Sequence, residues 1–206
     1  MQGVDKNLVL WNIPDRKKIL LMREDLYKIN QIAISSDNRY MVIASDNKRM
    51  YLWAFLEEKT KAYLCGHQDD IYSMDFTSGG NLQTRFIAST GRDMHVNVWR
   101  YGEEEDVMCS RFKAHDNAIN QVSFSKDATK LVTTSLDKDI KVFNIEGELL
   151  KTIKGKGRWE YTNSAIFNHD GKEILAATDN VIRVFEEESG MESFILEGHT
   201  KTVLCL

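Results

Sequence analysis

The sequence predicts an all-β protein in which one four-stranded antiparallel sheet is repeated along the chain. Short apolar runs separated by polar turns are typical of strands. Strand-ending aromatic residues recur at spacings of 42, 46, 44 and 42 residues, namely Trp11, Trp53, Trp99, Phe143 and Phe185. An acidic or amide residue stands six positions before each of them: Asp5, Asn47, Asp93, Asp137 and Asp179.

The best-defined unit runs from Gly66-His67 to Trp99 and contains three strand-like runs after the Gly-His pair. A repeat of roughly 40–45 residues with four strands per unit is the signature of a β-propeller blade. A single blade exposes both faces and is marginally stable, whereas blades stacked around an axis cover one another. We therefore expect a β-propeller of four-stranded antiparallel blades.

Taken in order, the chain predicts four complete blades and two partial ends within one propeller section, 1–206. The complete blades are expected at 29–65, 71–113, 119–153 and 162–197, and the partial blades at 1–22 and 198–206. The strands of the complete blades are expected at 29–34, 40–44, 49–54 and 61–65; 71–76, 85–89, 95–100 and 108–113; 119–124, 130–134, 140–145 and 149–153; and 162–167, 173–177, 181–186 and 192–197. In the last partial blade, the inner strand is expected to start at Val203.

The sequence resembles the WD-repeat family at Gly66-His67, Gly198-His199 and Ala114-His115, and at the Asp/Asn-x5-Trp/Phe endings. The resemblance covers essentially the whole chain. It implies a hydrogen-bonded chain of His, Ser or Thr, Asp and Trp within a blade. The complete set is His67, Ser89, Asp93 and Trp99, and a partial set is His115, Thr133 and Asp137. Phe143 replaces the Trp of the partial set and has no N–H, so that network is expected to end early.

The hydrogen-bonding needs of these residues also favour such a network, independently of the resemblance. A buried aspartate in a tight turn needs hydrogen-bond donors, which a histidine N–H and the turn amides can supply. The other ring nitrogen of His67 then needs a partner, and Ser89 is of the right type. The blades around Trp53 and Phe185 lack the histidine, so their turns are expected to be held differently.

The resemblance also implies a closed ring of seven blades, which at this repeat length needs about 300 residues. The chain is therefore expected to be a fragment of a longer protein or an incomplete gene model. Its terminal blades would then expose apolar faces through which copies could self-associate. The alternative is that 201–206 pairs with the strands at 5–11 and 17–22 to form a three-stranded fifth blade.

Composition narrows the class of protein. The chain is 42% apolar with a net charge of −4, as expected for one soluble globular domain. Cys65, Cys109 and Cys205 fall in expected strands and are predicted to be reduced, buried thiols of an intracellular protein. Cys65-x-His67 has no second ligand pair at metal spacing, so neither a metal nor another cofactor is expected. The absence of a membrane span or signal peptide predicts a cytoplasmic or nuclear protein.

A serine, a histidine and an aspartate in one blade do not predict a hydrolase. Ser89 is expected inside the blade at a strand end, whereas a nucleophile needs exposure and an oxyanion hole of unpaired N–H groups. The sequence has no Gly-x-Ser-x-Gly elbow. It also has no glycine-rich loop between a strand and a helix that would hold a phosphate. The chain is predicted not to be an enzyme.

The loops sort onto two faces because neighbouring strands run in opposite directions. One face is acidic at four successive blades, in the segments 57–58, 103–106, 146 and 186–188. These residues are either solvated turns or a docking surface for a basic partner.

On the other face, the loop 154–161 replaces the Gly-His element of its blade. Its residues Lys156, Arg158, Trp159 and Tyr161, together with Arg92, are the candidate partner-binding residues, because Trp, Tyr and Arg are enriched in binding hot spots. The alternative is that Trp159 packs down onto the blade where the histidine would have been.

The resemblance implies a non-catalytic scaffold that presents propeller loops to proteins or peptides within a larger assembly. A second hypothesis is a nucleic-acid or phosphate binder that uses the basic loop from Lys154 to Arg158. Base-stacking aromatic residues in a basic groove would be needed for nucleic acid, and one such loop in an acidic chain makes nucleic acid an unfavoured partner.

Overall fold

The computed structural model describes residues 8–22, 28–57, 59–77, 85–102, 107–155 and 157–206, with the backbone alone at 19–22 and 107. Asp5, Glu58, Lys156 and the acidic segment 103–106 therefore lie outside the described residues. Across those ranges the regular structure consists of strands, arranged as one two-stranded and four four-stranded antiparallel sheets. The all-β, four-stranded blade architecture expected from the sequence is confirmed.

The strand bounds follow the expected repeat closely. The two-stranded sheet contains β1 (Leu8–Asn12) and β2 (Lys17–Met22). The four complete blades contain β3 (Ile29–Ile34), β4 (Tyr40–Ser45), β5 (Arg49–Ala54) and β6 (Lys59–Cys65); β7 (Ile71–Phe76), β8 (Phe86–Gly91), β9 (His95–Arg100) and β10 (Val107–Lys113); β11 (Ile119–Phe124), β12 (Lys130–Ser135), β13 (Ile140–Asn144) and β14 (Leu149–Ile153); and β15 (Thr162–Phe167), β16 (Glu173–Thr178), β17 (Val181–Glu186) and β18 (Glu192–Leu196).

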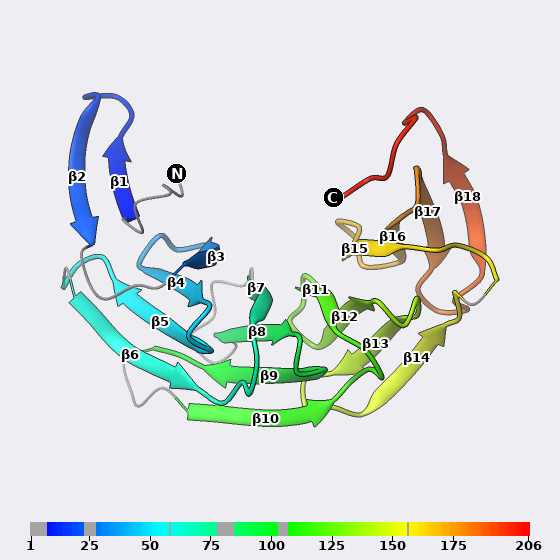
Figure 1. Ribbon diagram of the computed structural model, residues 1–206, viewed down its shortest axis with the longest axis horizontal. Coiled ribbons are helices and arrows are strands. Elements are labelled where there is room, and N and C mark those ends of the chain that lie inside the picture. The colour runs from blue at the N-terminus through cyan, green and yellow to red at the C-terminus, as the bar shows by residue number, and fades with distance from the viewer. Residues whose placement is uncertain (1–7, 23–27, 58, 78–84, 103–106, 156) are drawn as a thin grey trace.

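The sheets follow one another around an open arc (Figure 1). The inner strands β3, β7, β11 and β15 line its concave side, and β2, β6, β10, β14 and β18 lie on the outside. Within each complete blade the strands pair in chain order, so every connection is a hairpin. Turns between the second and third strands therefore lie on one face of the arc, and turns between the first and second strands lie on the opposite face.

A β-bulge recurs at the start of the inner strand of each complete blade. The register shifts between the first and third residues of the inner strand, at Ile29/Gln31, Ile71/Ser73, Ile119/Gln121 and Thr162/Ser164. Such a bulge bends a strand and increases its twist. The repeated sequence pattern thus produces a repeated backbone shape, which lets successive sheets pack face to face.

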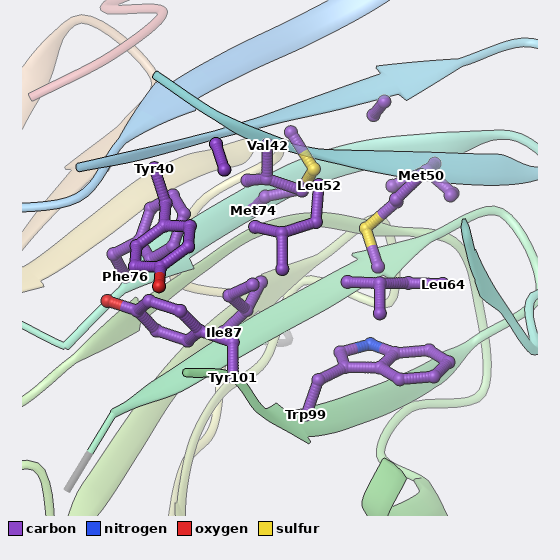
Figure 2. Packing of buried hydrophobic residues seen from close by; sticks show 13 residues of the cluster. Tyr40, Val42, Met50, Leu52, Leu64, Met74, Phe76, Ile87, Trp99 and Tyr101 are labelled. Atoms are coloured by element: carbon purple, nitrogen blue, oxygen red, sulfur yellow. The ribbon is translucent and has the colours of Figure 1, made fainter. Parts of the chain in front are cut away.

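The core lies between the blades rather than within them. Figure 2 shows the first interface, in which Val42, Met50 and Leu52 of the first complete blade meet Ile87 and Trp99 of the second. Each of these residues is at most 4% exposed. Burying a large apolar side chain stabilises a fold by roughly 1.5–3 kcal/mol, so each interface is a major source of stability.

Side chains on the inner strands join one blade to the next. Asn30 Nδ2 donates to the Ile71 carbonyl at 3.2 Å, and Asn120 Nδ2 donates to the Thr162 carbonyl at 2.8 Å. Asn163 Nδ2 makes the same bond to the Val203 carbonyl at 2.8 Å. Val203 therefore occupies the position expected for the start of an inner strand, although residues 201–206 have no assigned strand.

Among the described residues, the alternative closure through residues 201–206 is not formed. β1 pairs with β2 alone, whereas Leu206 N donates to Ser164 Oγ at 3.1 Å and Val203 N to the Asp179 carbonyl at 2.7 Å. The C-terminal residues are thus bonded to the last complete blade.

The prediction of buried cysteines was wrong. Cys65, Cys109 and Cys205 are all exposed, and Cys205 lies outside the assigned strands. Cys65 and Cys109 belong to the outer strands β6 and β10, where alternate residues face solvent instead of the neighbouring blade.

Candidate functional site

The complete His–Ser–Asp–Trp set is assembled within one blade. His67 Nδ1 lies 2.9 Å from Asp93 Oδ2, and His67 Nε2 lies 2.9 Å from Ser89 Oγ. Trp99 Nε1 donates to Ser89 Oγ at 3.1 Å. The ionised Asp93 carboxylate can only accept, so its bond to His67 Nδ1 needs a proton on that nitrogen. The His67 proton then sits on Nδ1 and is donated to Asp93.

Asp93 holds the turns on either side of it. The Gln68 amide donates to its Oδ2 at 2.9 Å, and the His95 amide donates to its Oδ1 at 3.2 Å. Burial alone would raise the pKa of Asp93, but the hydrogen bonds from His67 and from these amides outweigh it and lower the pKa to about 2. The next residue, Met94, is held at a φ of 63°, a left-handed conformation that costs a non-glycine residue roughly 1 kcal/mol.

The next blade carries the partial set. His115 Nδ1 lies 2.8 Å from Asp137 Oδ2, and His115 Nε2 lies 2.8 Å from Thr133 Oγ1. Burial acts to raise the pKa of Asp137, but the His115 contact and the turn amides lower it well below its usual range. Thr133 Oγ1 also lies 3.3 Å from the Lys141 carbonyl, as Ser89 Oγ lies 3.5 Å from the Asn97 carbonyl in the complete set. The buried Phe143 ring has no N–H, so the bond that Trp99 donates to Ser89 has no counterpart in this blade.

The first complete blade shows what happens without these residues. Ile43 stands at the position of Ser89, since each pairs across its hairpin two residues from the strand-ending tryptophan. The Trp53 N–H is buried and has no hydrogen-bond partner among the described residues. Asn47 replaces the turn aspartate and donates to the Tyr51 hydroxyl at 2.6 Å. This blade relies on apolar packing in place of a polar chain.

Trp159 fills the histidine position of the last complete blade. Its side chain is buried, its Nε1 donates to the Lys138 carbonyl at 2.9 Å, and its ring lies 6.0 Å from that of Phe185. Gly155 makes room for it, because a Cβ there would lie 2.5 Å from Trp159 Nε1. The geometry corresponds to the alternative in which Trp159 packs onto the blade, so its indole is not an exposed contact.

The two basic residues of this loop that the structure describes, Lys154 and Arg158, form ion pairs within the chain. Lys154 Nζ lies 2.7 Å from Asp139 Oδ2, and this hydrogen bond raises the pKa of Lys154. Arg158 lies 2.8 Å from Glu192, which also accepts from Arg183 at 2.9 Å. Carboxylates of this blade and its neighbour thus pair with Lys154 and Arg158, two of the basic residues on which the nucleic-acid hypothesis depends.

The remaining candidates are exposed but separated. Tyr161 is 53% exposed at the start of the last complete blade. Arg92 is exposed in the β8–β9 turn of the second complete blade, where it lies 3.8 Å from Asp69. The third blade stands between them, and its Leu136, at the position corresponding to Arg92, is 50% exposed. Arg92, Leu136 and Tyr161 therefore mark successive blades on the face that carries the His–Asp turns, which we call the His–Asp face.

Sequence reasoning missed Tyr72. It occupies the second position of inner strand β7, where the other complete blades have Asn30, Asn120 and Asn163. Its side chain is exposed and makes no inter-blade bond of the asparagine type among the described residues. The departure from an otherwise repeated asparagine was the signal that could have identified it.

The acidic segments of the opposite face are partly paired where the structure describes them. Glu57 lies 2.9 Å from Lys59, and Glu187 lies 2.9 Å from Lys130. Glu146 is exposed. No group of three metal-ligating side chains occurs in the described ranges. Nor do those ranges contain a helix of the length and apolar character needed to cross a bilayer.

Comparison with known proteins identifies the repeats. The family model for "WD domain, G-beta repeat" matches residues 23–54, 58–100 and 107–144, which is more than half of the chain. The chain belongs to the WD-repeat family. The resemblance inferred from the Gly-His and Asp-x5-Trp pattern is thus confirmed.

Individual WD-repeat relatives are distant and longer. Autophagy-related protein 16 of Arabidopsis thaliana is 21% identical over 89% of this chain and 35% of its own length. The U5 small nuclear ribonucleoprotein 40 kDa protein of Dictyostelium discoideum is 32% identical over 61% of this chain and 34% of its own. Pre-mRNA-processing factor 19 of the same organism is 26% identical over 84% and 34%. The chain spans between 12% and 39% of the length of these and other curated relatives it matches.

Proposed function

We propose that this WD-repeat chain acts as a non-catalytic scaffold that presents its loops to protein or peptide partners within an assembly. WD-repeat proteins generally act as protein-interaction scaffolds. The observation that carries the proposal is the row of exposed Arg92, Leu136 and Tyr161 on successive blades of the His–Asp face. Exposed tyrosine, arginine and leucine on a rigid sheet scaffold can be buried by a partner at low entropic cost.

The burial of the polar sets supports a role without catalysis. Ser89 is fully buried and already bonded to both His67 and Trp99, so its hydroxyl is not placed to attack a substrate. The carboxylates of Asp93 and Asp137 accept hydrogen bonds from turn amides and histidines. These groups stabilise the blades that carry the binding loops.

Among the candidates, we assign partner contact to Arg92, Tyr161 and the exposed side of Arg158, with Trp159 as the buried support beneath the loop. Arg158 stacks 5.1 Å from the Trp159 ring and is held by Glu192, so its guanidinium is presented in a defined position. We place the assembly in the cytoplasm or nucleus.

Variants on the two faces test the proposal. Leu136→Ala combined with Tyr161→Ala removes exposed apolar surface from the His–Asp face, and Leu56→Ala, in the β5–β6 turn of the opposite face, is the matched control. Affinity capture followed by mass spectrometry should show specific partners lost from the double variant and retained by Leu56→Ala. Retention of every specific partner by a folded double variant would refute the assignment.

A salt titration separates protein from nucleic-acid partners. Each phosphate contact on duplex DNA contributes a slope of roughly 0.9 in a plot of log affinity against log salt. We expect a shallow slope for the captured partners, because Lys154 and Arg158 are already paired with carboxylates. A steep slope that Lys154→Ala reduces by about one contact would favour the phosphate-binding alternative.

A further inference from the structure

A cavity of about 390 Å³ opens between the third and fourth complete blades, on the face opposite the His–Asp turns. It lies between the β11–β12 and β15–β16 turns and is lined by Phe167, Lys126, Lys130, Asp127 and His169, among others. Small-molecule sites span roughly 300–1,000 Å³, so this volume suits a group of the size of one large side chain.

The corresponding place between the first and second complete blades is filled by aromatic rings. Tyr40 and Tyr101 lie 5.4 Å apart, and Tyr101 lies 5.0 Å from Phe76, both in edge-to-face arrangements. Two cations stand beside Tyr40, with Lys61 at 5.3 Å and Arg85 at 6.0 Å from the ring centre. Figure 2 shows these three rings together at one end of the blade interface.

Strand register establishes that the two places correspond. Phe76 and Phe167 each end an inner strand. Tyr40 and Lys130 each begin the second strand of a blade and pair with the last residue of the third.

Tyr101 and Glu187 each follow a third strand and donate their backbone N–H to the residue before the second strand, at 3.1 and 2.7 Å. The ion pair between Lys130 and Glu187, at 2.9 Å, thus replaces the two tyrosine rings. The cavity remains because these two side chains supply no ring.

The turn aspartates at the two places, Asp37 and Asp127, also differ in their hydrogen-bond partners. Asp37 Oδ2 accepts from Arg85 of the neighbouring blade at 2.8 Å. Among the described contacts, the corresponding Asp127 bonds only within its own turn, to Ser125 and Thr129. Lys126 Nζ lies 2.9 Å from His169 Nε2. None of the ion pairs among the described residues includes Lys126, so its ammonium charge is available at the rim of the cavity.

We propose that this cavity receives an aromatic side chain, of tyrosine type, from a partner polypeptide. The ring would pack edge-to-face against Phe167 as Tyr101 packs against Phe76, and Lys126 and Lys130 would supply the cations that Lys61 and Arg85 supply at the filled junction. The ring cluster at the first junction thus shows the arrangement that we expect the ligand to adopt in the cavity. This site is separate from the His–Asp face and does not depend on the function proposed for that face.

The test uses 4-fluorophenol, an analogue of the tyrosine side chain, and ¹⁹F NMR titration of the whole chain. A fragment of this size in a preformed site binds with a Kd on the order of 1 mM. Glu187→Tyr should place a ring where Tyr101 places one and weaken binding at least tenfold. Glu188→Tyr is the matched control, because it makes the same chemical change at the next, exposed residue and should leave the Kd unchanged.

Intermolecular NOEs in the unaltered chain are the second measurement and require no variant to fold. Contacts from the probe ring to Phe167 support the proposal. The proposal is overturned if 4-fluorophenol causes no shift at about 10 mM, if its NOEs fall elsewhere, or if folded Glu187→Tyr binds it as tightly as the unaltered chain. Displacement of the probe by an equal concentration of inorganic phosphate would assign the cavity to anions and would also overturn it.

Discussion

Substituting the two turn aspartates by asparagine should separate a buried hydrogen-bond network from an ordinary turn. Asp93 uses both oxygens, because Oδ2 accepts from His67 and the Gln68 amide while Oδ1 accepts from the His95 amide. In Asp93→Asn, the new NH₂ group must face one of these donors. At Asp179, the Glu160 and Tyr161 amides both reach Oδ1, and an asparagine carbonyl can replace that oxygen.

Two routes lead to a similar magnitude for Asp93→Asn. The pKa of Asp93 falls from 3.8 to about 2, and at roughly 1.4 kcal/mol per unit this corresponds to about 2 kcal/mol of stability at neutral pH. Independently, leaving a buried donor without a partner costs about 1–3 kcal/mol. We expect a loss of about 2 kcal/mol for Asp93→Asn and less than about 0.5 kcal/mol for Asp179→Asn.

Urea unfolding monitored by tryptophan fluorescence measures both losses, and pH provides a second reading. Because the folded-state pKa of Asp93 is lowered, its contribution is present above the unfolded-state value and disappears as pH falls from about 5 towards about 2. The gap in unfolding free energy between the unaltered chain and Asp93→Asn should therefore close over that range. Equal losses at the two sites, or a gap that persists at low pH, would refute the assignment of the network.

Four further substitutions test how buried and exposed positions contribute to stability. Trp159→Ala should lower the unfolding free energy by about 3–5 kcal/mol, because it removes the buried ring that fills the histidine position of its blade. Tyr161→Ala should change the unfolding free energy by less than about 0.5 kcal/mol, because this side chain is exposed. Thermal unfolding of the two variants measures the difference. Gly155→Ala should abolish the loop conformation, since its Cβ would lie 1.9 Å from the Lys138 carbonyl oxygen, and loss of the near-UV signal of Trp159 would report it. Burial raises the pKa of Asp75 in the folded state, so ionisation of this carboxyl lowers the unfolding free energy of the unaltered chain as pH rises above about 4. The unfolding free energy of Asp75→Asn, measured relative to that of the unaltered chain, should therefore increase over the same range. Parallel curves of unfolding free energy against pH would contradict this.

The repeat made both the blades and the hydrogen-bonded sets predictable. A residue six positions before a strand-ending aromatic residue is placed by local geometry, since a short turn and one strand separate them. The partners of Asp93 could therefore be named from the resemblance to the WD-repeat family, which spacing and donor type supported. Phe143 has no N–H, so the bond from Trp99 to Ser89 cannot have a counterpart at Thr133.

Expectations about single loops and surfaces depended on contacts between blades. Lys154 and Arg158 looked available in the sequence, but their carboxylates come from Asp139 and from Glu192, 34 residues beyond Arg158. Cys65 and Cys109 were expected to be buried because they fall in expected strands, yet which side of an outer strand is covered depends on the neighbouring sheet. A two-residue period does not identify the buried side.

The order of the strands, their turns and the polar sets within a blade were thus already determined by the amino-acid pattern, because they depend on residues close together or in fixed repeat register. The place of Trp159 and the cavity beside Phe167 were decided only when whole sheets stacked. Packing between sheets depends on the combined shape of side chains from four strands, and the same position therefore holds two tyrosine rings at one interface and an ion pair beside an open space at another.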